Sequence, residues 1–290
     1  MSPEAHTEQV FQTILNFSDY ENRKTPWYEQ MNLLDIMKMA GYKTFWFSNQ
    51  EKTSLWESNP SILASRADFS FWTPPQPSES YDEQLISLYQ KHKSLLDTAS
   101  NEKNNKNLII FHLQGSHLEY KSRFPHSYAK FKPSDIDAKN LHTKYQKDLQ
   151  IISDYVNSLY YTDDVLNQIF DLFKNTDSII FYFSDHAQDV FQSDHSVGHR
   201  CSNYGVEIPF MIFVTDAFKM KHKKEVDLIK SALKKPFMTD DFIQSLLPLI
   251  GIKTQDNIES KNIFSSQFDI KRKRFYCGDN DYDKGKTIPY

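Results

Sequence analysis

Aspartate and histidine side chains follow an apolar run of the chain at the point where a strand would end. Asp185 and His186 come directly after the segment SIIFYF at 178–183. Carboxylate oxygens and imidazole nitrogens are common zinc ligands, and neighbouring residues at a strand end can both reach one ion. An isolated Asp-His pair is more often an ordinary turn with a capping aspartate, so this pair needs support from other residues.

Three further histidines could join such a site. His195 and His199 follow in the segment SDHSVGHR, and one or both could fold back over the same strand end. His117 follows the apolar run LIIFHL at 108–113, beyond a Gly-Ser turn. Each histidine alone would be interpreted as a turn or surface residue. Together with the Asp-His pair they indicate a metal site or a phosphate-binding site, and therefore a metalloenzyme.

The elements that must position these residues follow an α/β pattern. Apolar runs predict strands at 42–47, 108–113, 178–183 and 208–214. Helical spacing and capping signals predict helices from Pro26 to Gly41, over 82–97, over 143–174 and from Asp240 after a capping Thr239. Continuous apolar strands separated by helices predict a mostly parallel sheet with helices on both faces. Chemistry in such sheets lies beyond the carboxyl ends of the strands.

Composition narrows the class of protein further. The 290 residues are 39% hydrophobic, so the chain can build a large core. The net charge of −4 gives no support for nucleic-acid binding, and no glycine-rich nucleotide-binding motif is present. The polar stretch 100–107 predicts a surface loop. No apolar run is long enough to predict a transmembrane helix, and the first residues, MSPEAHTEQV, do not show the charged and apolar regions by which a signal peptide is predicted.

The two cysteines, Cys201 and Cys277, leave two alternatives open. They could form one disulfide or remain two free thiols. Two cysteines cannot by themselves form a cysteine-based zinc site, so any metal would need the histidines and carboxylates.

The same segments, in this order, resemble the sulfatase-like domain of bacterial phosphoethanolamine transferases. SDHAQ at 184–188 is similar to the family's SDHGE, and GSH at 115–117 and GH at 198–199 match two further motifs. NLLDIMKMAGYKTFWFSNQ at 32–50 and DYVNSLYYTDDVL at 154–166 also look like family segments. SPEAHTEQVFQTILNF at 2–17 resembles the nucleophile segment and places Thr7 at the catalytic threonine. The resemblance runs from residue 2 to about residue 252.

This resemblance implies an alkaline phosphatase-like fold and a zinc-dependent mechanism. Thr7 would be the nucleophile and would carry the phosphoethanolamine group as a phosphothreonine. Asp185 and His186, together with Thr7, would ligate the zinc. His117 and His199 would contact the phosphoryl oxygens or a second zinc and protonate the leaving group. His195 is a further candidate for the same site.

The resemblance also implies partners and a location. Phosphatidylethanolamine would be the donor, and lipid A, a sugar or a glucan of the cell envelope the acceptor. We expect residues 1–290 to be one catalytic domain, with the family's glutamate-bearing strand and membrane anchor upstream. The intact protein would work at the periplasmic face of the inner membrane, against the membrane surface. A soluble phosphate-ester hydrolase of the same superfamily, or a non-catalytic remnant of the fold, are the alternatives.

Overall fold

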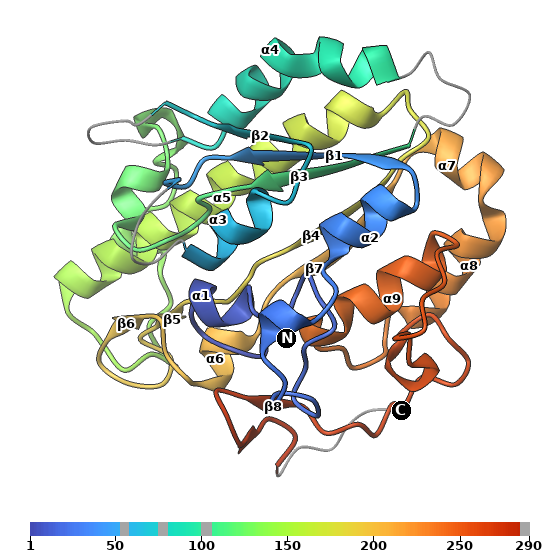
Figure 1. Ribbon diagram of the computed structural model, residues 1–290. Helices are drawn as coiled ribbons and strands as arrows, with labels where there is room; N and C mark the ends of the chain where they lie inside the picture. Colours follow the sequence, from blue (N-terminus) through green and yellow to red (C-terminus); the bar gives the residue numbers. More distant parts are fainter. Residues whose placement is uncertain (53–57, 75–80, 100–105, 285–290) are drawn as a thin grey trace. The chain divides into compact units, whose positions relative to one another are not determined.

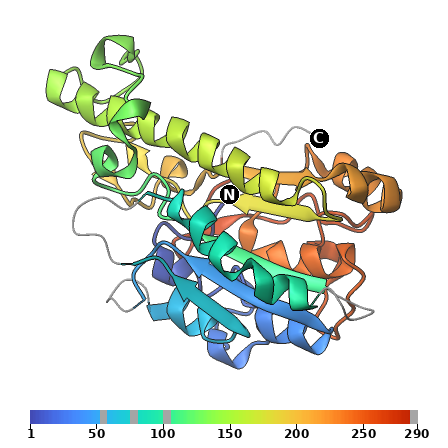
Figure 2. The same cartoon turned by 90° about the horizontal axis from the view of Figure 1, so that it is seen from above.

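The computed structural model describes residues 1–52, 58–74, 81–99 and 106–284, so the loop predicted at 100–107 lies almost entirely outside the described residues. The chain forms two compact units. Figure 1 and Figure 2 draw the helices and strands from two directions. The first unit comprises Met1–Ile36, Phe173–Ala187 and His199–Tyr290, and the second Met37–Leu172 and Gln188–Gly198. Within the described ranges, no helix is both long enough and apolar enough to span a membrane.

A three-stranded parallel sheet forms the centre of the second unit. Its order is β2 (Phe69–Trp72), β1 (Tyr42–Ser48) and β3 (Lys106–His112), and both pairings are parallel. β1 is the central strand, and Phe45, Trp46 and Phe47 are almost completely buried. The structure confirms the strands predicted at 42–47 and 108–113. The short β2 was not predicted.

Helices cover this sheet. The second unit contains α3 (Ser58–Ala64), α4 (Gln84–Ala99) and most of α5 (Gln146–Phe173), together with the short elements η2 (Tyr120–Arg123), η3 (His126–Tyr128), η4 (Pro133–Asp135), β5 (Asp189–Val190) and β6 (Val197–Gly198). α4 packs on the sheet because the ring of Tyr89 meets the ring of Phe47, with centroids 5.7 Å apart. Figure 1 shows α4 over one face of the sheet and α3 on the other. The helices predicted at 82–97 and 143–174 are confirmed.

The first unit is built around a strand pair that carries the candidate site. β4 (Ile179–Phe183) pairs with β7 (Phe210–Val214), and the pairing is antiparallel, unlike the sheet of the second unit. Apolar runs identify buried strands but carry no information on direction, which is why the exception was not predicted. Rings of Phe181 and Phe183 pack against Phe242 of α9 (Phe242–Leu249). The unit also contains α1 (Thr7–Val10), η1 (Trp27–Glu29), the start of α2 (Leu33–Met39), α6 (Asn203–Val206), α7 (Asp216–Lys221), α8 (Lys223–Ala232), η5 (Thr239–Asp241), η6 (Glu259–Lys261), β8 (Phe275–Tyr276) and β9 (Asn280–Asp281).

Two helix starts differ from the prediction. The helix expected from Pro26 is broken: η1 ends at Glu29, and α2 begins only at Leu33. The side chain of Asn32 accepts a hydrogen bond from the backbone N–H of Asp35 and so caps α2 in place of Thr25. Gly41, with φ of +82°, follows the helix as expected.

The helix expected from Asp240 also begins later. Thr239–Asp241 form the turn η5, and α9 starts at Phe242. The Thr239 hydroxyl lies 3.4 Å from the backbone carbonyl of Met1 and does not cap the helix. A hydroxyl that finds a tertiary partner of this kind cannot be told from a capping hydroxyl by its position in the sequence.

Candidate active site

Thr7, Asp185 and His186 lie together in the first unit, as the sequence predicted. Thr7 is the first residue of α1, and the other two follow β4. The hydroxyl of Thr7 donates a hydrogen bond to Asp185 Oδ2 at 2.7 Å. Thr7 Oγ1 is also 3.3 Å from His186 Nε2, and Asp185 Oδ2 is 3.6 Å from the same nitrogen. Three polar atoms from two distant parts of the chain therefore converge on one point.

The hydrogen bond of the other ring nitrogen of His186 determines which tautomer the ring adopts. His186 Nδ1 is 2.9 Å from the carbonyl oxygen of Ala187. A carbonyl can only accept, so Nδ1 carries the proton, and in the neutral ring Nε2 presents a lone pair. That lone pair faces the Asp185 carboxylate, an arrangement that a proton or a cation between them would stabilise.

This donor set fits a zinc ion. Two oxygens and an imidazole nitrogen are ligands that zinc accepts, and a backbone carbonyl on the second nitrogen is the usual way to orient a ligating histidine. The described part of the chain holds no cluster of three or more His, Cys, Asp or Glu suited to an ion. A zinc here would therefore depend on the hydroxyl of Thr7 as its third protein ligand.

Two more imidazoles border these three residues. The ring centroid of His199 is 4.4 Å from that of His186, and the His6 ring is 5.4 Å from His199. Burial lowers the pKa of His6, and the neighbouring His186 lowers it further, against the opposing charge of Asp185. His6 was not singled out from the sequence, although its position next to Thr7 was a signal that could have found it.

Backbone hydrogen bonds place Thr7 at this point. Three residues of the segment before α1 are buried, Ser2, Pro3 and Ala5, and Ser2 and Ala5 are at most 1% exposed. The N–H of Ser2 donates to the carbonyl of Val206, and the carbonyl of Pro3 accepts from the N–H of Cys277. Thr7 therefore does not rest on a loose end of the chain but on a segment tied to two other parts of the unit.

The loop that carries His199 is held in two ways. A disulfide joins Cys201 to Cys277, which decides between the two alternatives that the sequence left open. The carbonyl of Gly205 accepts a hydrogen bond of 3.0 Å from the N–H of Ala187, next to the Asp-His pair. A Cβ on Gly205 would lie only 1.9 Å from the carbonyl oxygen of Arg200, so this close approach requires glycine.

His117 and His195 belong to the second unit, so their convergence with Thr7 stays a prediction. His195 packs edge-on against His142, with ring centroids 5.9 Å apart. The turn before His117 is organised by Asp82, a buried residue that the sequence did not point to. Its carboxylate accepts hydrogen bonds of 2.8 Å from the backbone N–H groups of Gln114 and Gly115.

Comparison with known proteins places these features in a family. Residues 1–252 match the sulfatase family model, and the chain therefore belongs to the sulfatase family. The phosphoethanolamine transferase EptC of Escherichia coli is 27% identical over 98% of this chain and 48% of its own length. A Kdo(2)-lipid A phosphoethanolamine 7''-transferase of Salmonella typhimurium is 24% identical over 66% of this chain and 33% of its own length. The chain spans about half the length of the curated relatives that it matches most fully.

Solved structures show the same fold. The C-terminal periplasmic domain of EcEptC from Escherichia coli, solved in complex with Zn, has a TM-score of 0.82 at 24% identity, over 100% of this chain and 81% of that one. The corresponding domain of EptC from Campylobacter jejuni has a TM-score of 0.70 at 22% identity, over 92% of this chain and 81% of that one. The predicted alkaline phosphatase-like α/β fold is confirmed.

Proposed function

We propose that this chain is the catalytic part of a phosphoethanolamine transferase that uses Thr7 as its nucleophile and zinc as its cofactor. The observation that carries the proposal is the position of Thr7 Oγ1, 2.7 Å from Asp185 Oδ2 and 3.3 Å from His186 Nε2. Relatives named phosphoethanolamine transferase and a zinc complex of a protein with the same fold support it.

Each residue then has a definite role. Thr7 Oγ1 attacks the phosphorus of the donor while its proton passes to Asp185, the acceptor of its hydrogen bond. The bond from phosphorus to the lipid oxygen breaks, and His117 or His199 gives that oxygen a proton. The acceptor hydroxyl then attacks the phosphothreonine and gives its proton to the same histidine, while the bond from phosphorus to Thr7 Oγ1 breaks and Asp185 returns the proton to Thr7. His195 is a further candidate for contact with the phosphoryl group.

Thr7, Asp185 and His186 would hold the zinc. When bound, the ion lowers the pKa of a hydroxyl and neutralises charge that develops on the phosphoryl oxygens. Phosphoryl transfer needs mainly alignment and neutralised charge, so the remaining work of the chain is to keep Thr7 in line with the phosphorus.

The substrates and the location are part of the proposal. The donor is phosphatidylethanolamine at a membrane surface, and the acceptor is lipid A or a glycan of the cell envelope. The disulfide between Cys201 and Cys277 supports an oxidising compartment such as the periplasm, because disulfides of this kind are rare in the cytosol. The similar domains of EptC from Escherichia coli and Campylobacter jejuni are periplasmic as well.

Thr7 variants test the nucleophile. With headgroup-labelled phosphatidylethanolamine as donor, we expect the label to appear on the wild-type protein, at Thr7 in a peptide map. Thr7→Ala should lose the label, and Thr7→Ser should retain part of it because the hydroxyl remains. Label retained by Thr7→Ala would refute the role of Thr7.

Metal content provides a readout that does not need activity. Elemental analysis of the wild-type protein after dialysis against zinc should find at least one bound ion, and Asp185→Ala should reduce that number. A protein that binds no zinc would favour the non-catalytic remnant. Release of free phosphate from simple esters without transfer to any acceptor would favour the hydrolase.

A further inference from the structure

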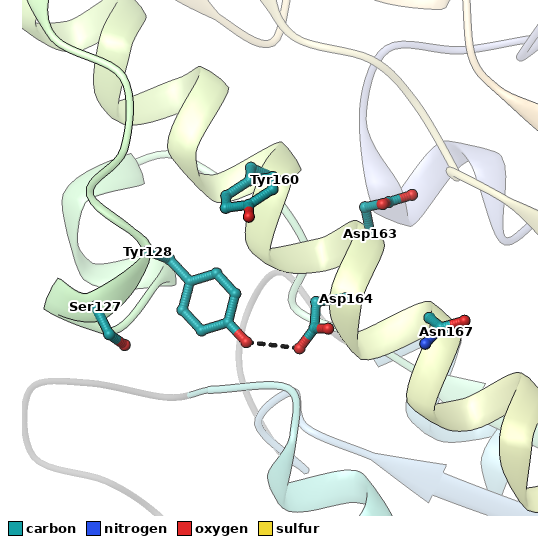
Figure 3. Close-up of a pocket in the computed structure, with 6 residues that line it drawn as sticks. All are labelled: Ser127, Tyr128, Tyr160, Asp163, Asp164 and Asn167. Atoms are coloured by element: carbon teal, nitrogen blue, oxygen red, sulfur yellow. Dashed lines mark hydrogen bonds between the residues drawn. The ribbon is translucent and has the colours of Figure 1, made fainter.

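A cavity of about 530 Å³ lies on the second unit, and none of the residues assigned to chemistry above lines it. Tyr160, Asp163, Asp164 and Asn167 line it from α5, and Ser127 and Tyr128 line it from η3. The spacing of the four α5 residues puts them on one face of the helix. Figure 3 shows the hydroxyl of Tyr128 pointing at Asp164, to which it donates a hydrogen bond. Its volume lies within the usual range for small-molecule sites.

The charge of the lining favours a cation. Two of the six lining residues are aspartates, and none of the six is a lysine or arginine. Asp164 accepts hydrogen bonds from Tyr128 at 2.6 Å and from Gln168 at 2.8 Å, and both donors use Oδ2. Oδ1 of Asp164 and the exposed carboxylate of Asp163 can therefore accept from a ligand.

The aromatic side chains favour an organic cation. The rings of Tyr128 and Tyr160 lie 5.8 Å apart at an angle of 56° and form a corner beside the carboxylates. Lys130 Nζ lies 4.7 Å from the ring centroid of Tyr160, so this ring can pack against an ammonium group, and a ligand there would share the ring with Lys130. Hydrated metal ions gain little from ring faces, and the described residues contain no cluster of three metal-binding side chains.

The corner is held rigidly. The ring of Tyr128 packs edge-on against Tyr161, which is 1% exposed, with centroids 4.9 Å apart. The hydrogen bond to Asp164 raises the pKa of Tyr128 to about 12, so its phenol remains a neutral donor across the physiological range. Because these aromatic side chains are already fixed, binding a ligand costs less conformational entropy.

We propose that this pocket binds a small organic ammonium group, held by the carboxylates of Asp163 and Asp164 and by the ring faces of Tyr128 and Tyr160. The group could come from a free amino alcohol or from the headgroup of a lipid. The proposal does not depend on the reaction assigned to Thr7, since none of these residues takes part in it.

Calorimetric titration of the full chain with choline and with ethanolamine tests the pocket. We expect saturable binding of both, weakened by salt, and no binding of 3,3-dimethyl-1-butanol, the uncharged analogue of choline. Asp163→Asn, Asp164→Asn and Tyr160→Leu should each weaken binding about tenfold, equivalent to ~1.4 kcal/mol. Asp171→Asn, an exposed position on the same helix, should leave binding unchanged.

Several outcomes would overturn the proposal. Equal binding of choline and its uncharged analogue would show an apolar pocket, and tighter binding of calcium or magnesium than of choline would show a metal site. Unchanged affinity in both aspartate variants, with circular dichroism showing folded protein, would place the ligand elsewhere.

Vesicles distinguish the two sources of the ammonium group. Binding to phosphatidylcholine or phosphatidylethanolamine vesicles, but not to phosphatidylglycerol vesicles, and competition by free choline would assign a lipid headgroup. Binding of the free amino alcohols alone would assign a soluble ligand. Thr7→Ala should bind choline with the affinity of the wild-type protein. Loss of the transfer reaction and loss of choline binding can therefore be measured separately.

Discussion

At the residue scale, the carboxylate of Asp82 holds the turn that leads to His117. It is buried and accepts three hydrogen bonds of 2.8 Å, from the backbone of Gln114 and Gly115 and from the side chain of Asn49. Burial raises the pKa of Asp82, and the hydrogen bonds oppose that rise by favouring the charged form. Asp82 therefore organises the turn before His117.

Asp82→Asn should test this role. The amide has one oxygen for three donors and brings an N–H₂ group towards them, so we expect the free energy of unfolding to fall by ~1–3 kcal/mol. Urea denaturation measures the change. Asp137→Asn, at a position outside this turn, serves as the control and should have little effect; an equal loss in both variants would contradict the role of Asp82.

Gly205 gives a second prediction at this scale. Gly205→Ala should shift the backbone near Arg200 and lower the free energy of unfolding by ~1–3 kcal/mol, as other overpacked sites do. Gly251→Ala is the matched control, because its φ is +81° but nothing lies within 4 Å of the added Cβ. That control should lose at most the ~1–2 kcal/mol of a left-handed backbone, and Gly205→Ala should lose more than the control because its Cβ also clashes with Arg200. Native-like stability of Gly205→Ala would show that the loop relaxes freely.

At the scale of elements, the disulfide joins the loop after His199 to the β8–β9 hairpin. Replacing both Cys201 and Cys277 by serine removes a link across 76 residues. Loop-closure entropy predicts a loss of ~4 kcal/mol in the free energy of unfolding. Thermal denaturation should show a lower midpoint for the variant, and a reductant should lower the midpoint of the wild-type protein only. An unchanged midpoint in reduced wild-type protein would contradict this.

The elements also show which parts of the fold the sequence can predict. Long amphipathic helices such as α5 and apolar strands such as β1 can be predicted because their hydrophobic residues recur at regular spacing or in an unbroken run. The predicted starts of α2 and α9 were wrong because several side chains near each helix could serve as its cap. Asn32 caps α2 in place of Thr25, and the hydroxyl of Thr239 bonds to Met1 and not to the helix. The direction of β7 could not be predicted, since an apolar run reads the same for either direction.

The candidate site was predictable only in part, for a related reason. Thr7 was placed by resemblance to a family segment, and its hydrogen bond to Asp185 joins residues 178 positions apart. Asp82 and Gly205 were missed because a single buried carboxylate or a glycine without positive φ has no sequence pattern. Such residues become visible only when their partners from distant segments are known.

At the scale of the whole molecule, a network of six charged side chains ties distant segments of the first unit together. Two cations are shared among four carboxylates: Lys261 and Arg272 with Asp19, Glu21, Asp240 and Asp241. Arg272 is central, with contacts of 2.6 Å to Asp241, 2.7 Å to Glu21 and 3.2 Å to Asp240. The arrangement couples the stability of the unit to pH.

Glu21 contributes one part of that coupling, whereas burial raises the pKa values of Asp240 and Asp241 and makes them act in the opposite direction. Burial alone would raise its pKa, but hydrogen bonds from Arg272 and Lys261 outweigh burial and lower it from 4.5 to about 2. A carboxyl whose pKa is lower in the folded state contributes its full stability above the unfolded pKa, and that contribution disappears as the pH falls from about 4.5 to about 2.

Glu21→Gln should therefore be less stable than wild type at pH 7 and lose less stability on acidification through this window. Solvent screening of a side chain that is 46% exposed limits the effect to ~1 kcal/mol. Urea midpoints at pH 7 and pH 3 measure it. Glu259→Gln, an exposed charge-matched control, should show the same change of urea midpoint with pH as the wild-type protein. An equal change of midpoint in Glu21→Gln and wild type would contradict the role assigned to Glu21.

The link between Cys201 and Cys277 has one more consequence, for limited proteolysis. It closes the intervening chain into a covalent ring, and the exposed stretch where α7 gives way to α8 lies inside that ring. A trypsin cut there opens the ring without releasing a fragment. The nicked protein would migrate as a single band on a non-reducing gel and separate into two pieces only after the sulfurs are reduced.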